Sequence, residues 1–98
     1  MPITSVITLK ADHEEAHRII TKMAPLIKKH GATSVRFGFC HSGSRTGTVS
    51  VVNVYPDWQA YGRAAQGMLD DKEFQGLLAE AMKAGEIVDR SLMVMQEL

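Results

Sequence analysis

The sequence predicts an α+β fold in which a four-stranded antiparallel sheet carries its helices on one face. Stretches with strand alternation and stretches with helical periodicity follow each other in the order β-α-β-β-α-β along nearly all 98 residues. A short turn rich in Gly and Ser separates the middle two strands, which is typical of a hairpin. The strands are apolar on both faces, although such connections place the helical segments on one side of the sheet. At this length we expect one domain, residues 1–98.

The first strand and the first helix occupy the N-terminal third of the chain. Residues Ser5–Ala11 are rich in β-branched side chains that alternate between two faces. Asp12 and Glu15 then form an Asp-x-x-Glu capping box, a pattern that begins helices. Apolar residues recur at helical spacing over Ala16–Ile27, and Gly31 follows a basic stretch as a stop signal. We therefore expect an amphipathic helix that packs on the sheet.

The next two strands form the predicted hairpin. They comprise Ser34–His41 and Thr48–Tyr55, and residues 42–47 make the turn. Because side chains alternate along a strand, each strand has one face with aromatic or polar groups. These side chains are Phe37, Phe39 and His41 on the first strand, and Asn53 and Tyr55 on the second.

The second helical region is predicted to be broken. An apolar stripe begins at Trp58, but beyond Asp70 it reappears rotated by about half a turn, so one straight helix cannot bury both parts. We predict two consecutive helices, Asp57–Leu69 and Asp71–Lys83, with the break near Asp70. A second capping box, formed by Asp70 and Glu73, is expected at the break.

The last strand completes the sheet and raises the question of what covers its second face. Residues Ile87–Glu97 alternate again, and the whole order is that of a ferredoxin-like sandwich. The uncovered face is a large apolar patch, and we expect a C2 homodimer in which two sheet faces pack together. The residues of this patch are Val6, Cys40, Val52, Val54, Met93 and Met95, or their neighbours on the opposite face.

Composition and charge exclude several functional classes. Eleven basic and eleven acidic residues give a formal net charge of zero, and no basic cluster indicates nucleic-acid binding. No apolar run is long enough to span a membrane, and the N-terminus has no secretory signal pattern. The single cysteine, Cys40, allows no internal disulfide and fits a reducing cytoplasm. We expect a cytoplasmic protein that binds neither nucleic acid nor membrane.

Two segments resemble the dimeric α+β barrel superfamily, which includes antibiotic-biosynthesis-type monooxygenases and NIPSNAP proteins. They are Val54–Tyr61 (VYPDWQAY) and Leu69–Phe74 (LDDKEF), and the resemblance extends over essentially the whole chain. It implies a cleft between the sheet and the helices, in which some members oxidise aromatic polyketides. Haem-degrading members supply an axial His from the second helical region, but this chain has no His after His41. No cofactor is therefore expected.

The candidate site residues surround the expected cleft. We assign catalytic roles to Asn53, Tyr55 and His17, because a buried amide needs hydrogen-bond partners and a His titrates near neutral pH. The predicted substrate-binding residues are Trp58, His41, Phe37 and Phe39. These residues suggest a cofactor-independent, monooxygenase-like enzyme that acts on a small apolar or aromatic molecule. A non-catalytic ligand-binding protein or a structural dimer is the open alternative.

Residues 13–17 match the H-E-x-x-H pattern of zinc metalloproteases literally. In that pattern two His side chains, here His13 and His17, would hold one zinc ion, and the Glu would activate its water. However, the motif lies in the first helical turn, and Glu15 already serves the capping box. A zinc protease instead carries the motif inside a long helix and needs a third ligand downstream. We therefore predict a helix start and no metal site, with a weak two-His site as the alternative.

Overall fold

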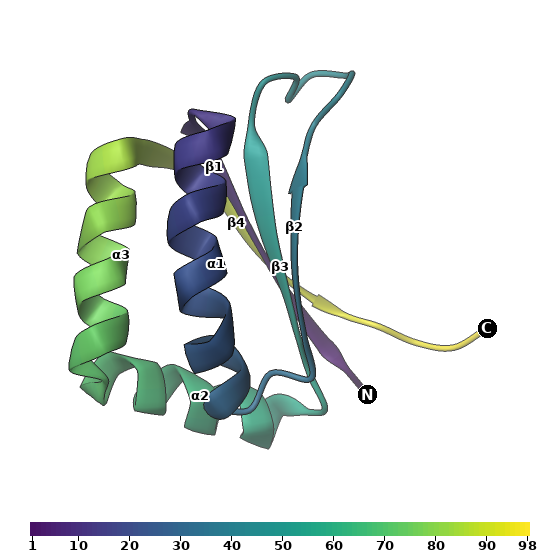
Figure 1. The fold of residues 1–98 in the computed structure, drawn as a ribbon. Coiled ribbons are helices and arrows are strands. Elements are labelled where there is room, and N and C mark those ends of the chain that lie inside the picture. Colours follow the sequence, from purple (N-terminus) through teal and green to yellow (C-terminus); the bar gives the residue numbers. More distant parts are fainter.

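A computed structural model describes all 98 residues, and its elements follow the order β-α-β-β-α-α-β (Figure 1). This order confirms the predicted α+β class and the broken second helical region. The elements are β1 (Ile3–Ala11), α1 (His13–Lys29), β2 (Ser34–Phe39), β3 (Val49–Tyr55), α2 (Trp58–Asp70), α3 (Lys72–Ala84) and β4 (Gly85–Val94).

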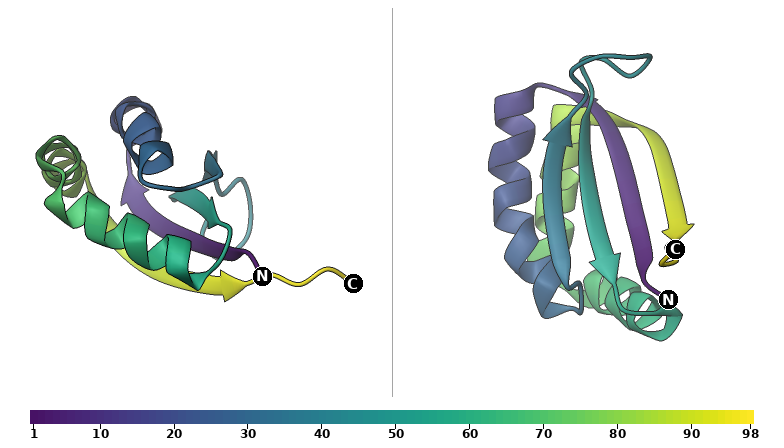
Figure 2. Two further views of the ribbon diagram at one scale, coloured as in Figure 1. Left: turned by 90° about the horizontal axis from the view of Figure 1, so that it is seen from below. Right: turned by 90° about the vertical axis from the view of Figure 1, so that its right-hand side faces the viewer.

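The four strands form one antiparallel sheet in the order β2-β3-β1-β4. All three helices cover the same face of this sheet, and α1 lies beside α3 (Figures 1 and 2). Helix α2 runs across one end of the helical layer and connects β3 to the N-terminal end of α3 (Figure 1). The C-terminal residues extend away from the body of the fold (Figure 2). None of the helices has the length and hydrophobicity needed to cross a membrane.

Strands β1 and β4 begin earlier than the sequence predicts. Strand β1 begins at Ile3 rather than Ser5, because Ile3 is paired with both Tyr55 and Val94. Strand β4 begins at Gly85 rather than Ile87, since Gly85 pairs with the last residue of β1. A Cβ atom at position 85 would lie 2.5 Å from the Cβ of Ala11, so this close approach requires glycine.

Each helix is capped by an aspartate, as the sequence indicates for Asp12 of the first helix. The carboxylates of Asp12, Asp57 and Asp71 accept hydrogen bonds from the backbone N–H three residues further on, at 2.8–3.1 Å. The cap at the break is Asp71 and not Asp70 as predicted. Asp71 closes α2 and opens α3 in an extended conformation, whereas Asp70 is still helical and exposed.

The core lies between α1 and the inner face of the central strands. Alternate residues of β3 are buried, and the apolar stripe of α1 packs over them. The most deeply buried large side chains are Tyr55, Ile3, Ile19 and Val49. On the opposite face of the sheet, Val52 and Val54 are only half-buried, and Met93 is 45% exposed. The predicted apolar outer face is therefore present.

Candidate functional site

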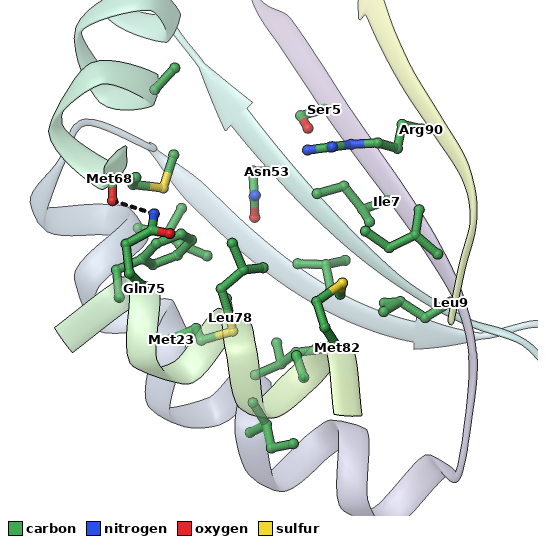
Figure 3. Close-up of a pocket in the computed structure, with 18 of the residues that line it drawn as sticks. Ser5, Ile7, Leu9, Met23, Asn53, Met68, Gln75, Leu78, Met82 and Arg90 are labelled. Atoms are coloured by element: carbon green, nitrogen blue, oxygen red, sulfur yellow. Dashed lines mark hydrogen bonds between the residues drawn. The ribbon is translucent and has the colours of Figure 1, made fainter. Parts of the chain in front are cut away.

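A cavity of about 420 Å³ lies between the helices and the sheet (Figure 3). Nineteen of its 23 lining residues are hydrophobic, and they come from all three helices and from β1, β3 and β4. Strand β2 contributes none. The other four lining residues are Ser5, Asn53, Gln75 and Arg90, and two of the nineteen, Tyr55 and Tyr61, also carry hydroxyl groups.

Each of the three helices contributes at least one small side chain to the cavity lining. Helix α2 turns into α3 at Asp71, so α3 leaves the sheet end and rises beside α1 (Figure 1). Ala16, Ala65 and Ala81 occupy the lining positions of the three helices. Their short side chains leave space that larger residues would fill at normal packing density. A hydrogen bond of 2.9 Å from Gln75 Nε2 to the Met68 carbonyl closes the wall at the break (Figure 3).

Asn53 is the buried polar group of the cavity floor. It is 5% exposed, and its Oδ1 atom has no hydrogen-bond partner. Its neighbours along β3 on the same face are Val51 and Tyr55, and its partner across the strand pair is Ser5. Leaving a buried acceptor unpaired costs about 1–3 kcal/mol. The Asn53 amide therefore has hydrogen-bonding capacity that no protein group of the fold uses.

Tyr55 lies beside Asn53 at the end of the same strand. It is 1% exposed, and its ring packs edge-on against Tyr61, with 5.3 Å between the ring centroids. Burial raises the pKa of Tyr55 to about 12, repulsion from the Tyr61 phenol adds to the shift, and the Asn53 amide opposes it. At neutral pH Tyr55 is therefore a neutral phenol that can donate a proton but cannot act as a base.

Arg90 is the one charged side chain that lines the cavity. It lies on β4 opposite Ile7, and in Figure 3 its guanidinium group extends over the floor toward Ser5. Arg90 forms no ion pair. The ion pairs of the structure all involve Arg18 or His30. The lining contains no Asp, Glu or His, so the cavity has a cation and hydrogen-bonding groups but no carboxylate or imidazole.

One known protein family matches this chain. The sequence model described as "Domain of unknown function (DUF6854)" matches residues 1–95. The chain belongs to this family. No curated protein matches its sequence.

Solved structures show the same fold at low sequence identity. The cofactor-independent oxygenase SnoaB from Streptomyces nogalater matches this DUF6854 protein with a TM-score of 0.69 and 14% identity. That match covers 99% of this chain and 95% of SnoaB. An uncharacterized NIPSNAP domain protein from Burkholderia xenovorans matches with a TM-score of 0.73 and 12% identity, covering 96% and 94% of the two chains. The predicted resemblance to these barrel proteins is thus confirmed at the level of the fold.

The predicted site residues of the DUF6854 protein fall into two separate places. Asn53 and Tyr55 line the cavity, but His17, Phe37 and Phe39 do not. The latter three form an aromatic cluster with His13 between α1 and the edge strand β2. Ring centroids in this cluster are 5.0–6.3 Å apart. The catalytic role of His17 and the binding roles of the two Phe residues remain predictions, and they concern this surface rather than the cavity.

His41 and Trp58 also lie outside the cavity lining. The sequence interpretation grouped His41 with Tyr55 as neighbouring strand ends, and this grouping is wrong. In the antiparallel hairpin Phe39 pairs with Val49, so His41 lies at the turn, a full strand length from Tyr55. Trp58 is 54% exposed and packs edge-on against Tyr61, with 6.2 Å between the ring centroids. Its predicted contact with substrate remains a prediction.

The sequence prediction missed Arg90, Ser5 and Gln75 as cavity residues. A signal for Arg90 was present, since it precedes Leu92 by two residues and shares the face of the strand that covers the core. Ser5 and Gln75 carry no comparable signal, because single polar residues of these types are common at surfaces.

The H-E-x-x-H segment begins α1, as the sequence indicates. His13 and His17 stack with 6.3 Å between ring centroids and an angle of 11° between the ring planes. Glu15 forms an ion pair with Arg18 at 2.6 Å. No group of three or more His, Cys, Asp or Glu side chains is arranged to hold a metal ion.

Proposed function

We propose that this chain binds a small, largely apolar aromatic molecule in the cavity and oxidises it with O₂ without a cofactor. The observation that carries the proposal is the unpaired Oδ1 of Asn53 on the floor of an otherwise apolar cavity. Ligand sites typically enclose about 300–1,000 Å³ and combine apolar walls with a few convergent polar groups. The cavity has both properties, and a bound hydroxyl or N–H group would satisfy Asn53.

The side chains around the cavity restrict the chemistry. Because the lining contains no carboxylate or imidazole and Tyr55 stays protonated, the protein offers no strong base. The substrate must therefore lose its proton readily by itself. A CH₂ group between two aromatic rings and conjugated with a carbonyl has this property, because its anion is a delocalised enolate.

Asn53 and Tyr55 are positioned to stabilise such an anion. The Asn53 amide N–H₂ and the Tyr55 hydroxyl are hydrogen-bond donors, and donors in a dry site stabilise an enolate oxygen strongly. The enolate carbon then transfers electrons to O₂. In the overall reaction CH₂ and O₂ give C=O and water, so one oxygen atom enters the product and the other leaves as water.

The non-catalytic alternative uses the same cavity. The absence of a base from the lining favours it, because a binding protein needs only shape and polar contacts. Binding without O₂ consumption is the distinguishing result.

We further infer that two copies of this chain associate through their outer sheet faces. The outer face carries half-buried valines and exposed methionine side chains around β1, β3 and β4. Burial of a patch of this kind against its own copy is a common route to a C2 dimer. The solved structures of the same fold support the fold of the single chain. They carry no information on this contact between two chains.

Anthrone provides a direct test of the oxidation, because it has the activated CH₂ group and is oxidised to anthraquinone. Purified protein is mixed with anthrone in aerated buffer, and O₂ uptake and anthraquinone absorbance are followed together. We expect the wild type to accelerate both, and the Asn53→Ala variant to lose roughly tenfold or more of that rate. Gln59→Ala, an exposed change on α2, is the control and should be unchanged.

Each outcome has a distinct meaning. Anthrone binding without accelerated O₂ uptake would support the non-catalytic alternative. Full activity of Asn53→Ala would contradict the assigned role of Asn53. Absence of both binding and oxidation, for anthrone and for the naphthalene probes described below, would overturn the proposal.

A further inference from the structure

The position of Arg90 indicates the charge of the cavity's ligand. Arg90 lies on the helix-facing side of β4, between the cavity-lining Ile87 and the next inward residue, Leu92. Around its guanidinium group the cavity offers apolar side chains and the Ser5 hydroxyl, and across the space α3 presents Leu78 and Met82 (Figure 3).

No acidic side chain of the chain neutralises this cation. The nearest carboxylates along β4, Glu86 and Asp89, pair in register with Lys10 and Thr8, whose side chains lie on the opposite face of the sheet. Glu80 on α3 is bonded to Arg18, at 3.0 Å. Asp71 at the break is bonded to His30. The guanidinium group thus keeps all its donors available at the cavity.

We propose that the ligand is an apolar aromatic acid whose anionic oxygens pair with Arg90. This inference rests on the proposed function, since it assumes that the cavity is the binding site, and it adds the charge of the ligand. A planar guanidinium group matches a carboxylate with two parallel hydrogen bonds, which are shorter and stronger than those between neutral groups. Arg90 itself is exposed, so this pair would form at the open side of the cavity, in contact with solvent.

Asn53 supplies the second, independent observation. It is more than nine-tenths buried, its Oδ1 has no partner, and it lies on the same floor as Arg90 in Figure 3. One end of the floor therefore presents a cation and the other presents an unpaired amide. An aromatic body with an acidic group at one end and a hydroxyl or N–H group at the other fits this arrangement, whereas a hydrocarbon leaves both groups unpaired.

A pair of naphthalene probes tests the charge directly. Binding of 2-naphthoate and of neutral 2-naphthamide, which have nearly the same shape, is measured by isothermal titration calorimetry. We expect the wild type to bind the acid roughly tenfold tighter than the amide, a difference that corresponds to about 1.4 kcal/mol. Added salt should weaken the binding of the acid and leave that of the amide nearly unchanged.

Three variants locate the effect. Arg90→Met keeps the length and apolar stem of the side chain and should reduce acid binding to the level of the amide. Arg90→Lys should restore part of the preference, because it retains the charge but loses the paired geometry. Arg63→Met, an exposed change on α2 outside the cavity lining, should behave as the wild type. Thermal unfolding of every variant establishes that it is folded.

The outcomes separate this inference from the proposed function. Equal binding of acid and amide by the wild type, or a preference that persists in Arg90→Met, would overturn the anion inference while leaving the cavity as a binding site. Absence of binding by both probes would overturn the anion inference and would count against the proposed function as well. If the protein oxidises anthrone but does not prefer the acid to the amide, the proposed function is supported and the anion inference is wrong.

Discussion

The Nε2 atom of His30 lies 2.8 Å from Oδ2 of Asp71, and this bond joins the end of α1 to the break between α2 and α3. An ionised carboxylate can only accept, so Nε2 is the donor. The other carboxylate oxygen, Oδ1, accepts from the Phe74 backbone N–H and caps α3. The contact fixes the corner of the fold at which Phe74 and Met68 form the cavity wall.

This pair makes stability depend on pH in the acid range. The His30 hydrogen bond, followed by that of the Phe74 N–H, holds the pKa of Asp71 below the ordinary value of a carboxyl group. A carboxyl group with a lowered folded-state pKa contributes stability above its unfolded-state pKa, and loses it as the pH falls through the folded-state pKa. We expect Asp71→Asn to be less stable than the wild type at pH 7, with the difference shrinking below about pH 4.

Urea unfolding from pH 7 to pH 3 measures this effect. Asp70→Asn is the control, because Asp70 is exposed and bonds only to Gln66, and its unfolding curve should follow the wild type. A constant difference between Asp71→Asn and the wild type across the pH range would contradict the assigned role of the carboxylate.

Two glycines of α2 should respond in opposite directions to the same substitution. A Cβ atom at Gly67 would lie 2.5 Å from Nδ1 of His30, whereas at Gly62 it would meet nothing within 4 Å. Gly62→Ala should stabilise the protein by about 0.5–1 kcal/mol through helix propensity. Gly67→Ala should destabilise it by roughly 1–3 kcal/mol, because it displaces His30 from Asp71. The free energies of unfolding in urea decide the matter, and equal stabilisation by both changes would refute the steric role of His30.

Asn53→Leu should raise stability while removing function. Leucine has a similar volume and leaves no unpaired acceptor, so the free energy of unfolding should increase by roughly 1 kcal/mol or more. Thr8→Val is the contrasting change, because the Thr8 hydroxyl has a partner in Ser50 at 3.1 Å and its loss should destabilise. Both are measured by urea unfolding, with anthrone oxidation as the functional assay. A destabilised Asn53→Leu protein would indicate that the amide has a structural partner.

Tyr55 should ionise late in an alkaline titration. Burial is the main cause that raises its pKa to about 12, above the ordinary value of a tyrosine. The unfolded chain therefore releases this proton first, so stability should fall as the pH rises from about 10 to 12. Absorbance of tyrosinate against pH should show one late step in the wild type, and Tyr55→Phe should lack it. A late step that survives in Tyr55→Phe would assign the raised pKa to another residue.

The proposed dimer predicts a specific response at the outer sheet face. Val54→Lys places a charge on that face, and light scattering should then report a monomer at micromolar concentrations at which the wild type is dimeric. Lys22→Glu changes an exposed residue of α1 and should leave the dimer intact. A wild type that is monomeric under these conditions would remove the basis for the sheet-face contact.

Local patterns predicted most of the fold correctly. The break in the second helical region followed from the phase of its apolar stripe, and the cap at Asp12 from its position before helical periodicity, whereas the cap at the break is Asp71 and not the predicted Asp70. The bounds failed where long-range pairing decides them. Ile3 joins β1 only because strands on both sides provide partners, and β4 begins early because Gly85 fits against Ala11.

The candidate site was predictable only in part. Asn53 stood out because a lone amide in a valine-rich strand is energetically unusual, and the structure places it in the cavity. Phe37 and Phe39 alternate along β2 in the same way that Asn53 does along β3. However, β2 is an edge strand, and it meets α1 beside the cavity rather than over it. Which strand lies at the edge depends on the sheet order, and alternation within a strand contains no information about that order.

The sequence by itself determined the class, the order of the elements and the apolar character of both sheet faces, because these depend on short-range periodicity. Only the tertiary structure decided that Asn53, Tyr55 and Arg90 meet in one cavity and that His17 and His41 do not. Strand register brings residues distant in the sequence together. The space left between the layers depends on side-chain volumes summed over three helices and three strands.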